Sequence, residues 1–307
     1  MTRGFTGMLR LAPEVERALI RGQPVVALET SLVAHGLPQP DGLAAALECE
    51  QRVRDAGVVP ATVAVADGCV RVGLGEPELE RLAAAADVRK VSARDLAACV
   101  ISGGLGATTV AGTLAVCRIA GIHFMATGGI GGVHRGWQDS RDVSADLREI
   151  AESPVCVVCS GTKSFLDVAA TLEELETRGI PVIGYGTDSF PLFYRRDSGF
   201  RLIDRADDPT TVATLAAAHW GFAREAGVVV AQPVAEQAAL ADDQVEGAID
   251  QALAEIEASG LQGADITPGV LARVHQLTGG ASLAANRRLV ADNAGLAAEI
   301  AASYYAE

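Results

Sequence analysis

Short apolar runs alternate with longer amphipathic stretches along this chain, and the alternation is the strongest constraint on its fold. The runs cover residues 24–29, 61–66, 122–126, 155–159, 181–185 and 228–231. Because they are short and apolar on successive residues, they predict strands that are buried on both faces of a sheet. Strands that alternate with helices indicate an α/β layered fold with a largely parallel central sheet.

Helical periodicity fills the gaps between these runs and continues alone to the end of the chain. The predicted helices cover residues 42–56, 77–86, 108–120, 165–178 and 210–225, and residues 234–305 predict helices only. Ser92 and Asp95 have the spacing of a capping box, and Thr267 and Pro268 fit the N-cap and first position of a helix. No linker or repeat divides the chain, so residues 1–307 are predicted to form a single domain.

The charge balance excludes one class of partner. The chain has 25 Lys and Arg residues against 39 Asp and Glu residues, a net charge of −14. A protein that follows a nucleic acid polymer needs a basic surface, so we expect no such partner. No apolar run approaches about 18 residues, and residues 1–17 lack the apolar core of a signal peptide. We therefore expect a cytoplasmic protein with no membrane partner.

The six cysteines lie within apolar segments, which favours reduced thiols in the core over a disulfide framework. Cys156 and Cys159 alone approach a motif. In a strand, their odd spacing sends the two side chains to opposite faces, so a redox or metal pair is the less favoured interpretation.

Polar residues and glycines gather next to several predicted strands. Ligands of open parallel sheets bind outside the carboxyl ends of the strands. Four segments fit this position: residues 27–31, 106–110, 127–146 and 160–163. We expect these segments to outline one crevice.

Lysine is scarce in this chain, and only Lys90 and Lys163 occur among its 25 basic residues. Arginine keeps its proton at workable pH, whereas a partly buried lysine can lose it, and the neutral amine attacks a carbonyl to give a Schiff base. Lys163 follows a predicted strand, so we predict that it is functional. For Lys90, a function and a plain surface position are equally open. Thr162 precedes Lys163 where a phosphate loop needs glycine, which excludes a nucleoside triphosphatase.

Glu29 closes an apolar run, so its carboxyl group should be partly desolvated. Desolvation raises the pKa of a carboxyl and suits it for donating a proton near neutrality. A solvated cap at the edge of the sheet is an equally open interpretation.

Residues 106–109 combine a glycine with two hydroxyls before a helix, an arrangement that favours a phosphate group, although such motifs are common. The run of glycines in residues 128–136 should let the backbone approach a ligand, with His134 and Arg135 supplying polar contacts. It is not a dinucleotide fingerprint, because His134 occupies the place of the third glycine.

Three carboxylates, Asp139, Asp142 and Asp146, follow the glycine run. Carboxylates suit a hard cation that keeps several waters, such as Mg²⁺ or Mn²⁺. A solvated acidic loop is the alternative.

In combination and order, these motifs resemble the pseudouridine-5′-phosphate glycosidase family. The resemblance runs from about residue 20 to the end of the chain. It rests on residues 27–30 (ALET), 35–36 (HG), 90–92 (KVS), 106–111 (GATTVA), 126–136 (ATGGIGGVHRG), 142–147 (DVSADL), 161–164 (GTKS), 184–187 (GYGT) and 277–280 (LTGG), followed by Ser282, Leu283 and Asn286. Ser31 and Leu192 depart from the family pattern, which has Thr and Ala there.

The resemblance implies a reversible reaction in which pseudouridine 5′-phosphate and water give uracil and ribose 5-phosphate. It is a lyase activity of the hydro-lyase class, also called pseudouridylate synthase, and it serves pseudouridine catabolism. Carbon is a poor leaving group, and a sugar opened as a lysine imine supplies the electron sink, so the two-carboxylate scheme of common glycosidases does not apply. The resemblance also implies a three-layer α/β/α fold, a cytoplasmic homotrimer and one Mn²⁺ per subunit, with Mg²⁺ or another divalent ion as the alternative.

The family pattern also assigns roles to individual residues. Lys163 corresponds to the nucleophile on C1′, Glu29 to the proton donor and Asp142 to the carboxylate that holds manganese. The positions that match substrate-binding residues are Lys90, Val110, Ser144, Ala145 and Asp146. We further infer that Thr108 and Thr109 assist at the phosphate and that His134 and Asn286 contact the sugar or the base.

Two other functions share part of this pattern. An imine-forming sugar phosphate aldolase would use the lysine and the phosphate site but would not account for the glycine-histidine run. A non-catalytic sugar phosphate sensor would have no need of Lys163 beside Glu29. The residues therefore favour the glycosidase.

Overall fold

The computed structural model describes residues 7–222, 225–261 and 266–306. Its strands are β1 (Leu9–Leu11), β2 (Val25–Leu28), β3 (Val59–Ala66), β4 (Cys69–Val72), β5 (Arg89–Val91), β6 (Gly106–Thr108), β7 (Phe124–Ala126), β8 (Val133–His134), β9 (Cys156–Cys159), β10 (Leu166–Asp167), β11 (Val182–Tyr185), β12 (Asp204–Ala206) and β13 (Val228–Ala231).

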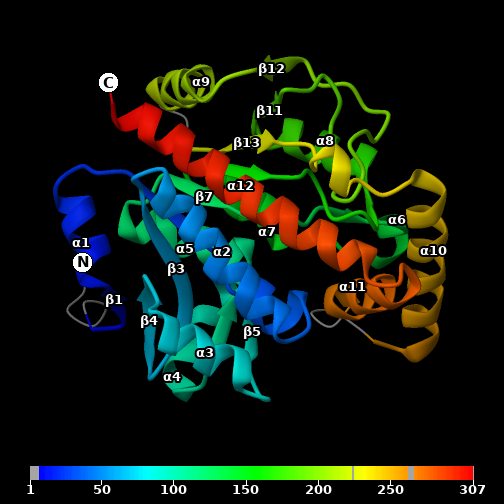
Figure 1. Cartoon of the computed structure of the whole chain (residues 1–307), viewed down its shortest axis with the longest axis horizontal. Coiled ribbons are helices and arrows are strands. Elements are labelled where there is room, and N and C mark those ends of the chain that lie inside the picture. The colour runs from blue at the N-terminus through cyan, green and yellow to red at the C-terminus, as the bar shows by residue number, and fades with distance from the viewer. Residues whose placement is uncertain (1–6, 223–224, 262–265, 307) are drawn as a thin grey trace.

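The helices alternate with these strands and then continue alone to the C-terminus (Figure 1). They are α1 (Pro13–Ile20), η1 (Leu32–Gly36), α2 (Asp41–Asp55), α3 (Glu76–Ala84), η2 (Ala93–Asp95), α4 (Leu96–Ser102), α5 (Val110–Ala120), α6 (Trp137–Ser140), α7 (Ala145–Ala151), α8 (Val168–Thr177), α9 (Pro209–Gly221), η3 (Glu236–Ala238), α10 (Asp242–Ser259), α11 (Ile266–Leu277) and α12 (Ala281–Tyr305).

A central sheet of 11 strands passes through the protein. Its main part has the order β3-β2-β7-β9-β13-β11-β12, and every neighbouring pair there is parallel. All six predicted strands belong to this part. The prediction of a largely parallel central sheet is therefore confirmed.

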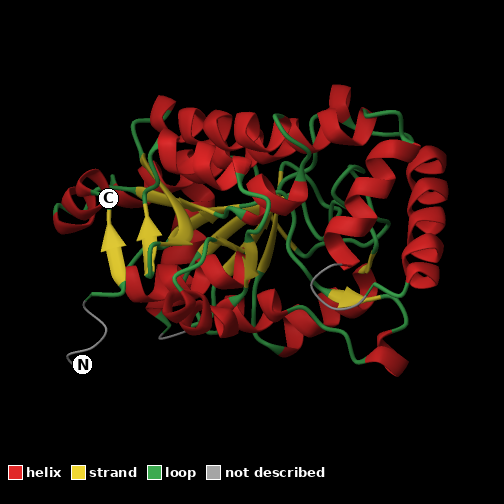
Figure 2. Cartoon of the chain, turned by 90° about the horizontal axis from the view of Figure 1, so that it is seen from below, coloured by secondary structure: helices red, strands yellow, loops and turns green. Residues whose placement is uncertain are grey.

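Helices cover both faces of the sheet, which confirms the three-layer α/β/α architecture (Figure 2). Successive side chains of β2 alternate between the layers, as the strand geometry requires. Val26 and Leu28 pack into the core shared with α2, α9 and α12, and Val25 and Ala27 pack into the core shared with α1, α5 and α7.

The 25-residue helix α12 runs beside α2 across one face of the sheet (Figure 1). Many of its inward residues are fully buried alanines, including Ala294, Ala297 and Ala301. Side chains this small let the helix approach the strands closely. The prediction of an all-helical C-terminal part is confirmed for the described residues, and residues 262–265 lie outside them.

The sequence did not reveal the mixed extension of the sheet beyond β3. There β4 and β6 pair antiparallel with β3, β1 pairs with β4, and β5 pairs with β6. One signal was present: Asp67 and Gly68 join β3 to β4, and both have positive φ. An Asp-Gly pair of this conformation is a frequent two-residue hairpin turn.

Several predicted helix boundaries were wrong. The helix expected over 108–120 begins at Val110, because β6 ends at Thr108. The helix expected over 165–178 begins at Val168, after the strand residues of β10. Thr267 lies inside α11 and is not its N-cap. At Ser92, the expected capping contact is present, because its N–H donates to the Asp95 carboxylate at 3.2 Å.

The cysteine predictions are confirmed. All six thiols are free and buried. Cys156 belongs to the core on the α12 side of the sheet, and Cys159 belongs to the core on the opposite side. Within the described ranges, no helix is both long enough and apolar enough to cross a bilayer.

Candidate active site

Side chains next to the ends of β2, β5, β7 and β9 enclose two adjoining cavities. The large cavity, of about 320 Å³, and the small cavity, of about 50 Å³, share the lining residues Glu29, Ser31, Lys90, Lys163 and Thr267. All four polar segments expected from the sequence contribute to one or both of these cavities. The predicted crevice therefore exists.

Lys163 is held between the ends of two neighbouring strands. Beyond β9, Gly161 turns the chain with a φ of +75°, and a side chain there would collide with the backbone of Pro191. The half-buried Lys163 then points its Nζ at the carbonyl oxygen of Gly129, to which it donates at 2.9 Å. Its backbone N–H donates to the carbonyl of Ile130 at 3.2 Å. The amine is thus fixed on the glycine-rich segment.

Glu29 lies at the end of β2 and faces both cavities. Burial raises the pKa of its carboxyl group, and this effect outweighs the hydrogen bond from Ser31 and the positive charge of Lys163, which lower it. The N–H of Leu32 donates to its Oε2 at 3.1 Å, and the Thr127 hydroxyl donates to its Oε1 at 3.3 Å. A carboxyl group with a raised pKa is suited to acting as a general acid.

Glycines of residues 128–136 line both cavities, and the run also packs closely against neighbouring side chains. A Cβ on Gly129 would lie 2.6 Å from the Phe193 ring, and one on Gly132 would lie 2.4 Å from the Thr171 hydroxyl. Arg135 forms an ion pair with Asp250 at 3.0 Å and does not line either cavity. His134, in contrast, lines the large cavity as predicted.

The start of α5 forms one wall of the large cavity. The Asp146 carboxylate accepts the N–H of Ala111 at 2.9 Å and that of Gly131 at 2.7 Å, which ties the helix to the glycine-rich segment. Thr109 caps the helix by accepting the N–H of Gly112. Among the described residues, this leaves the N–H of Val110, at the first helical position, for an anionic ligand.

Ser144, Ala145 and Asp146 line this cavity too, as do Lys90 and Thr109. Thr108 does not, which corrects its expected place at the phosphate. Its fully buried hydroxyl donates to the carbonyl of Val63 on the neighbouring strand β3 at 2.7 Å.

The residues around Asp142 offer little to a metal ion beyond one carboxylate. Asp142 is partly exposed, and its Oδ2 lies 3.8 Å from the Nδ1 of His134. Burial lowers the pKa of His134, Asp142 raises it, and the two lysines lower it further. The described part of the chain contains no group of three or more potential metal-ligating His, Cys, Asp or Glu side chains. The site therefore fits a largely hydrated ion, and not one enclosed by protein ligands.

Two asparagines on one face of α12 lie close to the small cavity: the first lines it, and the second binds the backbone of a residue that lines it. Asn286 is 2% exposed and lines the small cavity, and its Oδ1 has no hydrogen-bond partner among the residues that the structure describes. Asn293, seven residues further on, donates through Nδ2 to the Thr127 carbonyl at 2.8 Å and to the Ser160 hydroxyl at 3.1 Å. We did not identify Asn293 from the sequence, although a polar residue on the buried face of an apolar helix was the available signal.

A third hollow, an open groove of about 920 Å³, lies away from these residues. It is bordered by α1, α2 and the segment around β4 and α3 and contains paired charges, such as Arg54 with Glu14 at 2.7 Å and Arg71 with Glu78 at 2.7 Å. None of the predicted site residues lines it.

Known proteins resemble this chain over almost its whole length. A family described as indigoidine synthase A like protein matches residues 14–303. A pseudouridine-5′-phosphate glycosidase of Hahella chejuensis is 48% identical over 299 residues, which cover 97% of this chain and 99% of the relative. The chain therefore belongs to the indigoidine synthase A like family, whose relatives at this level of identity are named pseudouridine-5′-phosphate glycosidase. A pseudouridine-5′-phosphate glycosidase of Escherichia coli is 47% identical, with 97% and 96% covered.

Solved structures of this family share the fold. The prealnumycin C-glycosynthase in complex with ribulose 5-phosphate has a TM-score of 0.89 and 39% sequence identity, with 97% of both chains covered. An indigoidine synthase A like protein of Thermotoga maritima has a TM-score of 0.87 and 34% identity, also with 97% of both chains covered. The family assignment made from the sequence is therefore confirmed.

Because the pKa of Glu29 is raised, replacing Glu29 should increase the stability of the protein in alkaline buffer and lower its activity. Since folding disfavours the charged carboxyl, the wild-type protein should lose stability as the pH rises through the folded-state pKa, and the penalty should be absent below the unfolded-state pKa. The Glu29→Gln variant should therefore unfold at a higher urea concentration than the wild type in alkaline buffer, and at a similar urea concentration in acidic buffer. Activity should fall in the same variant.

The control for the loss of one negative charge is Glu80→Gln, because Glu80 is exposed on α3. Urea unfolding across pH measures both variants. A wild type that is more stable than Glu29→Gln in alkaline buffer would contradict the assigned direction.

Proposed function

We propose that this chain reversibly cleaves the C–C glycosidic bond of pseudouridine 5′-phosphate, with water, to give uracil and ribose 5-phosphate. The observation that carries the proposal is a fixed lysine amine beside a carboxyl of raised pKa, in a cavity that ends at a helix start. Relatives that cover almost the whole chain are named for this activity. A C-glycosynthase with the same fold is complexed with ribulose 5-phosphate.

The two residues divide the chemistry between them. The neutral amine of Lys163 attacks C1′, the bond from C1′ to the ring oxygen breaks, and Glu29 gives its proton to that oxygen. The attacking nitrogen then releases one proton, and its lone pair forms an iminium with C1′ as the bond from C1′ to C5 of uracil breaks. The electron pair of that bond stays on C5 and takes up one proton there, which balances the proton that the nitrogen released. Water hydrolyses the imine and releases ribose 5-phosphate and Lys163. The activity is thus that of a lyase, and hydrolase is an imprecise term, because water enters only at the release.

We assign the two cavities to the two ends of this substrate. The large cavity offers the N–H of Val110, the ammonium group of Lys90 and the hydroxyls of Thr109 and Ser144, which suit a phosphate. The small cavity is more apolar, and the Oδ1 of Asn286 can accept an N–H from the base. His134 lies where it can contact the sugar. Asp146 then acts by positioning, since both its carboxylate oxygens bind backbone N–H groups.

Trapping with borohydride tests the imine. Ribose 5-phosphate followed by borohydride should leave a reduced adduct on Lys163, found by peptide mass spectrometry, because reduction makes the imine permanent. Lys163→Arg should keep the fold and abolish both the adduct and uracil release, since a guanidinium cannot become a neutral nucleophile.

Lys90→Arg is the matched control, and its adduct should remain on Lys163. An adduct on Lys90, or turnover by Lys163→Arg, would reject the assignment. Uracil release from pseudouridine 5′-phosphate separates the glycosidase from an imine-forming aldolase, which would trap the sugar but release no uracil.

We further propose that one Mn²⁺ per subunit, with Mg²⁺ as the alternative, is held by Asp142 and water. When bound, the ion would supply positive charge next to the phosphate. Removing divalent ions should lower uracil release, and Mn²⁺ should restore it in the wild type but not in Asp142→Asn. Paramagnetic broadening by Mn²⁺ measures binding directly, and equal binding by both proteins would exclude Asp142 as the ligand.

The assembled enzyme is proposed to be a cytoplasmic homotrimer. Large apolar side chains on the surface, such as the fully exposed Ile203 and the mostly exposed Phe222, are compatible with contacts between copies. Sedimentation equilibrium should give about three times the chain mass of 31.6 kDa, and a monomer would contradict the trimer. Cell fractionation should recover the protein with cytoplasmic markers.

A further inference from the structure

The small cavity is bounded by an aromatic side chain that comes from a distant part of the sequence. Phe193 lies in the long connection between β11 and β12, yet it lines this cavity together with Leu32, Leu271 and Asn286. Its ring packs on the backbone of the glycine-rich segment: a Cβ on Gly129 would come within 2.6 Å of it. The ring thus occupies a place next to the carbonyl that holds Lys163.

Phe193 adopts a backbone conformation that bulky residues rarely have. Its φ is +56°, in the left-handed region that favours glycine. It opens a tight turn in which Leu192 and Arg195 exchange two backbone hydrogen bonds at 2.9 and 3.0 Å. Strained conformations of this kind persist where the surroundings enforce them and cluster at functional sites.

The turn is fixed directly to the end of β9. The N–H of Phe193 donates to the Ser160 carbonyl at 2.8 Å, and Leu192 forms a bridge with Gly161. Lys163 lies only two residues beyond this bridge. The neighbouring Tyr194 is fully buried, with its ring 4.7 Å from that of Phe193, so the turn has little freedom to move away.

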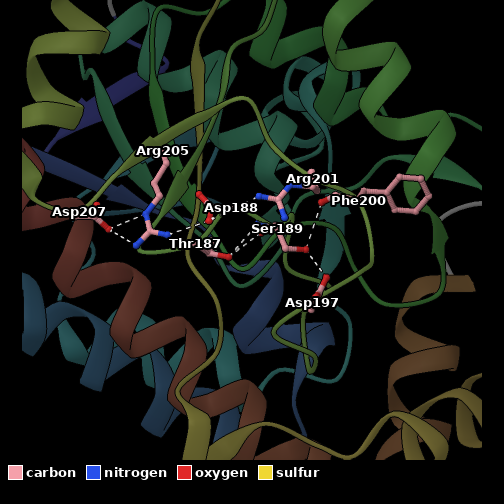
Figure 3. Close-up of polar contacts among 8 residues, drawn as sticks. All are labelled: Thr187, Asp188, Ser189, Asp197, Phe200, Arg201, Arg205 and Asp207. Carbon is pink, nitrogen blue, oxygen red and sulfur yellow. Dashed lines mark hydrogen bonds and ion pairs between the residues drawn. The ribbon is translucent and has the colours of Figure 1, made fainter.

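A separate polar network stiffens the rest of the connection (Figure 3). Ser189 donates to the Asp197 carboxylate, which also accepts the N–H of Gly199 at 2.7 Å. Arg205 pairs with Asp188 at 3.2 Å and with Asp207 at 2.7 Å. These residues line neither cavity, so Phe193 is the part of this connection that contacts the small cavity.

We propose that Phe193 is a specificity-determining residue. Its ring forms one wall of the small cavity, and this wall limits the cavity to one planar, six-membered pyrimidine. This inference rests on the proposed function, because it requires the base to occupy the small cavity. The chemistry fits: a flat apolar wall suits the face or edge of a base, and the Asn286 oxygen suits its N–H. The sugar phosphate lies in the other cavity, so Phe193 should not act on it.

The test separates the two ends of the substrate. Phe193→Gly removes the ring and keeps a residue that accepts the backbone conformation, and Phe193→Ala removes the ring with the conformational cost retained. Both variants should raise the KM for uracil in the synthetic direction by about tenfold or more. Borohydride trapping of ribose 5-phosphate on Lys163 should stay as in the wild type.

Phe200→Ala is the matched control, because Phe200 lies on the same connection, is 41% exposed and lines neither cavity. The relative use of 6-methyluracil over uracil should increase in Phe193→Gly and stay unchanged in Phe200→Ala. An unchanged KM for uracil in both Phe193 variants would overturn the proposal, as would loss of trapping in parallel with uracil use. A wild type that traps the sugar but never uses uracil would instead reject the proposed function.

Discussion

The buried side-chain amide of Asn293 connects the C-terminal helix to the two strand ends on which the site depends. Its Nδ2 binds the Thr127 carbonyl after β7 and the Ser160 hydroxyl after β9. The Thr127 hydroxyl donates a hydrogen bond to the Glu29 carboxylate, and Lys163 follows Ser160 by three residues. Leaving any of these buried polar groups without a hydrogen bond would lower the stability of the folded state. The hydrogen bonds therefore hold α12 and the two strand ends in fixed positions relative to one another.

This frame explains how a lysine and a carboxyl can be prepared for opposite tasks in one crevice. Burial raises the pKa of Glu29 so that it can keep a proton, while its contacts with Ser31 and the charge of Lys163 limit the effect. The Lys163 amine is directed by a carbonyl oxygen rather than by a carboxylate. A carbonyl fixes the direction of the amine, which supports the role of nucleophile that we propose for Lys163.

The glycine-rich segment packs closely against side chains from other parts of the chain. Gly129 leaves room for the Phe193 ring, and Gly132 leaves room for Thr171. The segment can therefore lie between the sheet, the β11–β12 connection and α8 at the same time. The carbonyl of Gly129 in this segment accepts the hydrogen bond from Lys163.

The sequence by itself determined the six central strands, the helices between them and the helical end of the chain, because periodicity is a local property of the residues. It also determined the family and most of the cavity lining, since Lys163, Glu29, His134 and Val110 belong to contiguous motifs.

Only the tertiary structure decided the rest. The short strands β1, β4, β5 and β6 form because β3 and its neighbours offer edges to pair with, and their few residues carry little pattern of their own. Thr108 turned out to line neither cavity, Phe193 turned out to line the small cavity, and Asn293 turned out to bind the backbone of Thr127 next to it. Their roles arise from contacts between residues far apart in the chain, and such contacts leave no local pattern in the sequence.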